Sequence, residues 1–223
     1  MFVTTALLYY SFDTSTIYGS TVTNLGSGGS AYNAVLMNGA TITNAVADKV
    51  VGSSAVKLSS ASSQYIQIPP FQTGSNGVTV AFWFKFSGSS TNSHAFDFGN
   101  GKIVNNLLFI LQSSGDCSLL GYHNSTQTSK SSVFNQVVND GVWRHAAWTI
   151  DYNGNWIAYL NGQQTTSALN LYYPSAITRS YNFLGKSNSG SDPYMNGGID
   201  EFYMFQNVLT APQVLELYQR KTV

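Results

Sequence analysis

Charged side chains are scarce in this sequence. Only 9% of its 223 residues are Asp, Glu, Lys or Arg, and ten basic side chains balance ten acidic ones. A typical globular protein has about 25% charged residues. Nucleic acids and anionic membrane surfaces attract proteins through dense positive charge, so we expect no nucleic-acid partner. Surface polarity has to come from neutral Ser, Thr, Asn, Gln and Tyr, as in many secreted, virion and cell-surface β proteins.

Cysteine and histidine are rare as well. The single cysteine, Cys117, excludes an intrachain disulfide and a cluster of thiolate metal ligands, and we expect it to be buried among apolar side chains. The three histidines, His94, His123 and His145, lack the spacing of a zinc site. The sequence therefore predicts neither a disulfide scaffold nor a transition-metal centre.

Long apolar runs are missing too. No stretch of about 18 apolar residues occurs, so we expect no membrane insertion. The opening MFVTTALLYY has no basic region before its apolar residues and does not resemble a signal peptide. For a protein acting outside a cell, at a cell surface or on a virion, we therefore expect a piece of a longer chain, with other domains as partners, or delivery in a particle.

Alternating apolar residues are abundant. From Val78 to Phe86 every second residue is Val or Phe, and the residues between them are Thr, Ala, Trp and Lys. This period of two predicts a strand whose Val and Phe side chains enter a core while Trp83 points to the opposite face. Similar runs predict strands at residues 65–68, 95–98, 105–112, 143–150, 155–161, 181–184 and 198–205.

Turn and helix signals complete the pattern. Asn153-Gly154 predicts a tight hairpin turn. Thr210 as N-cap, Pro212 in the first turn and Gln213 at the capping-box position predict a short helix near the C-terminus. We therefore expect an all-β fold, an antiparallel jelly-roll β-sandwich with one short C-terminal helix, that forms a single domain over residues 1–223.

Seven segments in a fixed order carry a resemblance. They are LYYSFD at 8–13, VTVAFWFK at 78–85, FDFGN at 96–100, GVWRHAA at 141–147, YLNG at 159–162, LGKS at 184–187 and GGIDEF at 197–202. Together the segments resemble the laminin-G-like branch of the concanavalin A-like lectin/glucanase superfamily. The resemblance implies one concave and one convex antiparallel sheet. It fixes no activity, because lectins, adhesion modules, glycoside hydrolases and polysaccharide lyases share this fold.

The resemblance also implies a structural calcium ion. The matching positions are Asp13, or its neighbour Ser11, together with Asp200 and the backbone around Gly52. Two carboxylates, backbone carbonyls and water would supply the six to eight oxygen atoms that Ca²⁺ prefers. The alternative is that Asp13 and Asp200 cap turns through hydrogen bonds to the backbone.

Catalytic signals are weaker than binding signals. Glutamates occur only at Glu201 and Glu216, and no strand carries the acidic residues at alternating positions that the glucanases of this superfamily use. A polysaccharide lyase could use Tyr122 and His123 as bases and Arg144 to neutralise a carboxylate, although the groove would carry few basic residues. The catalytic residues thus stay undefined, and an enzyme is the less favoured alternative.

Glycan binding without cleavage agrees best with the composition. Aromatic rings pack against sugar CH groups, and neutral polar side chains bind sugar hydroxyls. The candidate ligand-binding residues are Trp83, Tyr122, His123, Asn188, Asp192 and Tyr194. We expect a carbohydrate-binding or adhesion module for a cell-wall or cell-surface glycan. The alternatives are an enzyme, lyase or hydrolase, that degrades a cell-wall glycan, and a structural protein of a virion or surface.

Overall fold

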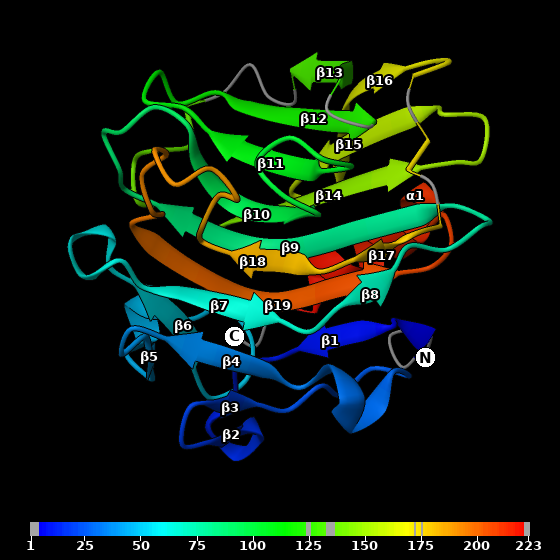
Figure 1. The fold of residues 1–223 in the computed structure, drawn as a ribbon. Coiled ribbons are helices and arrows are strands. Elements are labelled where there is room, and N and C mark those ends of the chain that lie inside the picture. The colour runs from blue at the N-terminus through cyan, green and yellow to red at the C-terminus, as the bar shows by residue number, and fades with distance from the viewer. Residues whose placement is uncertain (1–4, 124–125, 133–136, 172, 175, 221–223) are drawn as a thin grey trace.

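Two antiparallel sheets packed face to face make up the protein, as the computed structural model shows for residues 5–123, 126–132, 137–171, 173–174 and 176–220 (Figure 1). The architecture is the expected concanavalin A-like jelly-roll sandwich. One sheet has eight strands and the other has nine. Among the described residues, the short helix α1 is the single α-helix, and no helix is long and apolar enough to cross a membrane.

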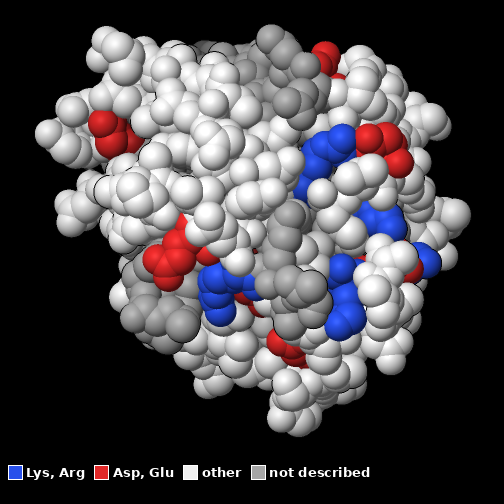
Figure 2. All heavy atoms as spheres, turned by 180° about the vertical axis from the view of Figure 1, so that it is seen from behind, with Lys and Arg blue, Asp and Glu red and all other residues white. Residues whose placement is uncertain are grey.

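The eight-stranded sheet lies at the back of Figure 1. In spatial order its strands are β16 (Gln163–Ala168), β15 (Trp156–Leu160), β14 (Arg144–Ile150), β9 (Val78–Phe86), β19 (Gly197–Phe205), β6 (Ala55–Leu58) and β5 (Thr41–Thr43), with β1 (Leu8–Tyr10) paired to β19. Seen from behind, this side of the molecule is largely uncharged, and its Lys and Arg side chains gather mainly toward one half (Figure 2).

The nine-stranded sheet lies in front. Its order is β13 (Thr126–Ser132), β12 (Cys117–His123), β11 (Leu107–Leu111), β10 (Ser93–Gly99), β18 (Tyr181–Leu184), β7 (Tyr65–Ile68), β4 (Ala34–Met37), β3 (Thr21–Val22) and β2 (Ile17–Tyr18). A small ribbon joins β8 (Phe71–Gln72) to β17 (Thr178–Arg179). Short 3-10 turns lie at Thr14–Thr16, Gly29–Tyr32, Val46–Asp48 and Ser60–Ser62.

Alternation along β9 builds the core as predicted. The Val and Phe side chains of this strand are buried between the sheets: Val78, Val80, Phe82, Phe84 and Phe86. The Phe82 ring meets the Phe109 ring of β11 edge to face, with ring centroids 5.2 Å apart. Cys117 is buried in the same core, which confirms the expectation for this thiol.

Trp83 faces away from the core, as the alternation predicts, but it is not available to a ligand. Helix α1 (Ala211–Gln219) covers this outer face of the eight-stranded sheet, and Trp83 is only 2% exposed. The Trp83 ring stacks on Tyr218 of the helix at 5.4 Å. The prediction of Trp83 as a ligand-binding residue is therefore wrong, because periodicity identifies a face but not what lies on it.

The hairpin between β14 and β15 forms where Asn153-Gly154 predicts it. Gly154 has φ +74°, and its N–H donates to the Asp151 carbonyl at 3.0 Å. At the next turn both Asn161 and Gly162 have positive φ, at 51° and 78°, a pair of angles that suits a two-residue turn. The predicted capping box is present too, since Gln213 Oε1 accepts the Thr210 N–H at 2.9 Å.

Candidate functional site

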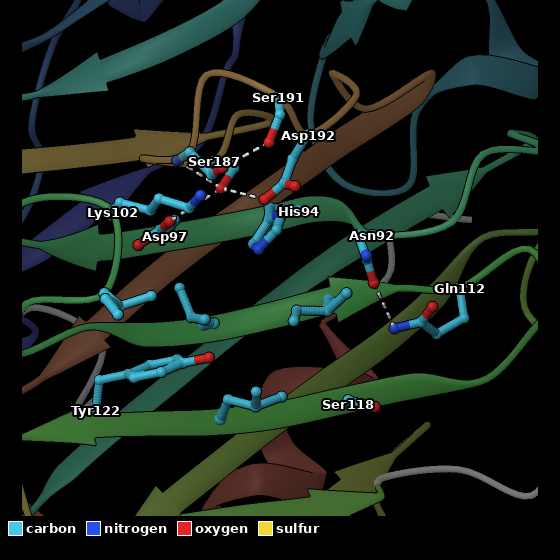
Figure 3. Close-up of a pocket in the computed structure, with 15 residues that line it drawn as sticks. Asn92, His94, Asp97, Lys102, Gln112, Ser118, Tyr122, Ser187, Ser191 and Asp192 are labelled. Atoms are coloured by element: carbon cyan, nitrogen blue, oxygen red, sulfur yellow. Dashed lines mark hydrogen bonds between the residues drawn. The ribbon is translucent and has the colours of Figure 1, made fainter. Parts of the chain in front are cut away.

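A cleft of about 310 Å³ lies on the outer face of β10, β11 and β12. The inner face of these strands fills the core, so the alternate side chains point outward. Leu108, Ile110 and Leu120 form the floor as a small apolar cluster. The segment 187–192, after β18, forms one wall above β10 (Figure 3). The cleft therefore combines an apolar floor with polar walls.

Asp97 fastens this wall to the sheet. Its carboxylate is buried, and it accepts hydrogen bonds from the Asn106 side-chain amide and from the Asn188 backbone N–H, both at 2.7 Å. The Ser187 hydroxyl lies 3.5 Å from Asp97 and 2.8 Å from Asp192, so it links the two carboxylates. Burial raises the pKa of Asp97 to about 7, against hydrogen bonds that lower it.

His94 adds a neutral polar group beneath the same wall. Its side chain is only 3% exposed, and Nδ1 finds no hydrogen-bond partner among the described residues. Burial lowers the pKa of His94 to about 4, although the nearby Asp192 carboxylate acts in the opposite direction. The imidazole is therefore uncharged at neutral pH.

The remaining polar side chains lie along the cleft. Tyr122 and Gln112 lie at opposite ends of it, and Lys102 also lines it (Figure 3). The Gln112 amide donates to the Asn92 side-chain carbonyl at 3.3 Å, which orients both amides. Donors and acceptors thus surround an apolar floor, an arrangement that can bind several hydroxyl groups while the floor contacts CH groups.

The structure brings only some of the predicted ligand-binding residues together. Tyr122 and Asp192 both line the cleft. Asn188 supports it through the backbone bond to Asp97, while its side chain faces a neighbouring hollow of the same sheet. Tyr194 packs against Tyr65 at a ring distance of 6.0 Å, and exposed His123 ends β12; neither lines the cleft.

The lyase residues are not assembled into one site. Tyr122 and His123 end β12 of the nine-stranded sheet, whereas Arg144 begins β14 of the other sheet. The two terminal guanidinium nitrogens of Arg144 donate to the Asp140 carboxylate, at 2.6 and 2.8 Å. The predicted combination of these three residues as catalytic groups is therefore wrong, because Arg144 is engaged on a different sheet.

Most residues of the cleft were not predicted from the sequence, among them His94, Asp97, Lys102 and Gln112. A usable signal exists for Asp97. It lies between Phe96 and Phe98, so a period of two places it on the outer face of the sheet. No local pattern identifies Lys102 or Gln112, because the position of each follows from the pairing of β10 with β11.

The expected calcium ligands do converge. Asp200 Oδ2 accepts the backbone N–H groups of Val50 and Val51, at 2.9 and 3.0 Å, while Oδ1 is buried with no hydrogen-bond partner among the described residues. Gly52 packs so closely on Asp13 that a Cβ there would collide with the Asp13 carboxylate. The N-terminal segment, the loop before β6, and β19 thus meet at one point.

The same region also shows features of the turn-capping alternative. The Asp13 carboxylate accepts the backbone N–H of Ser53, and the Lys49 ammonium donates to the Gly52 carbonyl at 2.7 Å. Among the described residues, no three His, Cys, Asp or Glu side chains form a group that could hold a metal. Asp200 Oδ1, buried without a hydrogen-bond partner among the described residues, is the kind of oxygen atom that Ca²⁺ prefers, and the calcium site stays a prediction.

The two-sheet architecture places the protein among the lectin-like β-sandwiches. Residues 60–215 match the family described as the concanavalin A-like lectin/glucanases superfamily, and the chain belongs to this family. Adhesion G-protein coupled receptor D1 of Homo sapiens is 25% identical over 152 residues, which cover 65% of this chain and 16% of the receptor. The match thus spans far less than two thirds of that relative.

Solved structures share the fold at low sequence identity. Domain 4 of AbnA, a GH43 extracellular arabinanase from Geobacillus stearothermophilus in complex with arabinotriose, has a TM-score of 0.73 and 22% identity, and the match covers 96% of this chain and 98% of that one. The binding domain of Paraclostridial Mosquitocidal Protein 1 has a TM-score of 0.72 and 13% identity, and the match covers 98% of this chain and 52% of that one. The binding domain of botulinum neurotoxin DC in complex with SialylT has a TM-score of 0.68 and 11% identity, and the match covers 96% of this chain and 50% of that one.

Proposed function

We propose that this protein binds a cell-wall or cell-surface glycan in the cleft over β10, β11 and β12, outside the cell. The observation that carries the proposal is the apolar floor of Leu108, Ile110 and Leu120 within walls of polar side chains. A sugar ring presents CH groups and hydroxyls together, so it needs both kinds of surface. The low and balanced charge, ten basic and ten acidic residues, agrees with a ligand held by hydrogen bonds rather than by charge.

The structural relatives support the same class of ligand. One was solved with arabinotriose, one with SialylT, and the cell entry of botulinum neurotoxin type C is described as dependent on two ganglioside molecules. These sugars are ligands of the relatives. They support oligosaccharides as the first ligands to test on this chain.

A glycan array followed by calorimetry tests the proposal. We expect Tyr122→Ala to weaken binding of the array hit by about tenfold, the equivalent of about 1.4 kcal/mol, because the ring lines the cleft. Tyr152→Ala is the matched control, since Tyr152 is 69% exposed in the β14–β15 turn of the other sheet. Binding that is lost in neither variant, or no hit on any glycan, would contradict the proposed site.

Analysis of the sugar products in the same samples distinguishes binding from cleavage. A lyase would create unsaturated sugar ends that absorb ultraviolet light, and a hydrolase would create reducing ends. We expect neither product from a glycan that the cleft binds, because Tyr122 and Arg144 lie on different sheets. A structural virion or surface protein would bind no glycan and would assemble in size-exclusion chromatography.

We further propose that Ca²⁺ stabilises the fold next to Asp200. The Asp200 and Asp13 carboxylates and backbone carbonyls around Gly52 would hold the ion, with water completing its shell. The ion would tie the N-terminal segment to the loop before β6 and to β19. Its contribution would be to stability, because the glycan cleft lies on the other sheet.

A further inference from the structure

A second hollow, of about 240 Å³, lies on the outer face of the eight-stranded sheet. It is lined by β5, β6, the start of β19, and Trp143, which precedes β14. The glycan cleft described above lies on the outer face of the opposite sheet, so the two sites share no residue. We refer to this second hollow as the Trp143 pocket.

The indole of Trp143 provides an apolar wall. The edge of its ring packs against β19 at Gly198, where a Cβ would come within 2.9 Å of the Trp143 ring carbon Cη2. Val56 and Leu58 of β6 border the same pocket, but their side chains are buried in the core between the sheets, so the indole supplies the apolar surface. The Trp143 indole is therefore the apolar wall of a pocket whose rim carries polar and charged side chains.

Two lysines at the rim share one aspartate. Lys85 Nζ lies 2.8 Å from Asp48 Oδ1 and also donates to the Ala47 carbonyl at 3.0 Å. Lys57 Nζ lies 3.8 Å from Asp48 Oδ2, and its side chain is 64% exposed. The hydrogen bond from Lys85 lowers the pKa of Asp48, so this carboxylate is ionised and occupied mainly by Lys85. One positive charge, that of Lys57, is thus left largely uncompensated.

The rim also carries neutral hydrogen-bonding groups. The Asn196 side-chain amide donates to the Ser87 hydroxyl at 3.3 Å, and both residues line the pocket. The Lys and Arg side chains of this side gather mainly toward one half of the surface in Figure 2, with acidic side chains beside some of them. The pocket thus offers an aromatic wall, an ammonium group, and a hydroxyl and an amide within a small volume.

We propose that the Trp143 pocket binds an acidic sugar, a pyranose ring that carries a carboxylate. The CH groups of the ring would pack on Trp143, the carboxylate would pair with Lys57, and ring hydroxyls would bind Ser87 and Asn196. A neutral sugar would leave the Lys57 charge without a partner, and a small anion would make no use of the indole. The combination of the two features selects a carboxylated sugar.

An NMR titration of the intact chain with glucuronate tests this proposal. The indole N–H of Trp143 is buried without a hydrogen-bond acceptor among the described residues, so its resonance reports contact with the ring; Trp143→Phe assigns the signal. We expect glucuronate to shift this resonance with an affinity about tenfold higher than that of glucose or acetate. We expect Lys57→Gln to weaken glucuronate binding roughly two- to fivefold, as for a partly exposed ion pair.

Each control has an outcome that decides the matter. Lys102→Gln removes a lysine from the glycan cleft and should leave the glucuronate response unchanged. If acetate binds as tightly as glucuronate, the pocket is only an anion site. If glucose binds as tightly as glucuronate, Lys57 plays no role in selecting the ligand. Either result overturns the proposal, and so does the absence of any shift of the Trp143 resonance. Loss of the response in Tyr122→Ala would place the ligand in the cleft, which also overturns it. Loss of glycan binding in the cleft alone would leave the Trp143 pocket unaffected.

Discussion

Asp97 holds the wall of the cleft and also makes the stability of the fold depend on pH. It joins β10 to the wall of the cleft through Asn188 and to the residue before β11 through Asn106, and burial raises its pKa to about 7 from an ordinary value near 4. A carboxyl group with a higher pKa in the folded chain than in the unfolded chain favours folding while it is protonated. Its contribution is present below about pH 4 and is lost as the pH rises through 7.

We therefore expect Asp97→Asn to gain stability relative to the wild type as the pH rises from 4 to 7. The gain should be about 1.4 kcal/mol for each pH unit, because the neutral amide does not ionise. Urea denaturation at several pH values measures it. His94 acts in the opposite direction, since its pKa is lowered to about 4, but it is present in both chains and cancels in the difference.

The exposed Asp116 provides the matched control for this measurement. It lies in the turn between β11 and β12, outside the core and the Asp97 network. Asp116→Asn controls for the loss of one carboxylate outside the Asp97 network. A difference between wild type and Asp97→Asn that stays constant over the whole range would contradict the raised pKa, whatever its absolute size.

At the scale of elements, helix α1 decides what the outer face of the eight-stranded sheet can do. Val214 and Leu217 of the helix are buried against Ala81, Tyr159 and other side chains of that face. We expect Leu217→Ala to lower the free energy of unfolding by about 2–5 kcal/mol, because it removes a buried apolar side chain and leaves a cavity. Chemical denaturation measures this loss.

The same helix offers a surface control one residue away. Glu216 is exposed, so Glu216→Ala should change the free energy of unfolding by no more than about 0.5 kcal/mol. Near-UV circular dichroism should change in Leu217→Ala, since Trp83 stacks on Tyr218. Equal stability of the two variants would mean that the helix does not protect this face.

Elements with a strong period were predictable from sequence, and short edge elements were not. The strand β9 and the predicted runs at 65–68 and 181–184 have the bounds that the alternation indicated. The strands β2, β3 and β5 contain only two or three residues each, too few for a period of two to emerge. The burial of Trp83 also had no local signal, because the covering helix lies more than a hundred residues away in the chain.

For the whole molecule, the sequence predicted the sandwich but not its functional surface. Tyr122 and Asp192 were predicted and do line the cleft, yet it is Asp97 that holds its wall, through contacts between β10 and the segment after β18. Such contacts join residues some ninety positions apart. The two sheets also expose different chemistry, a polar cleft on one and a lysine-rimmed indole on the other.

Three segments that are distant in sequence pack together near Asp200: the N-terminal segment, the loop before β6, and β19. A cation that binds only the folded chain stabilises it by about 2.7 kcal/mol at a concentration a hundred times its dissociation constant. We expect a chelator to lower the melting temperature of the wild type and added Ca²⁺ to restore it. Asp200→Asn should abolish this response and Asp13→Asn should weaken it, whereas Asp116→Asn should retain it. A wild-type melting temperature that is the same with chelator and with Ca²⁺ would show that Asp13 and Asp200 serve only to hold the backbone of the loop before β6.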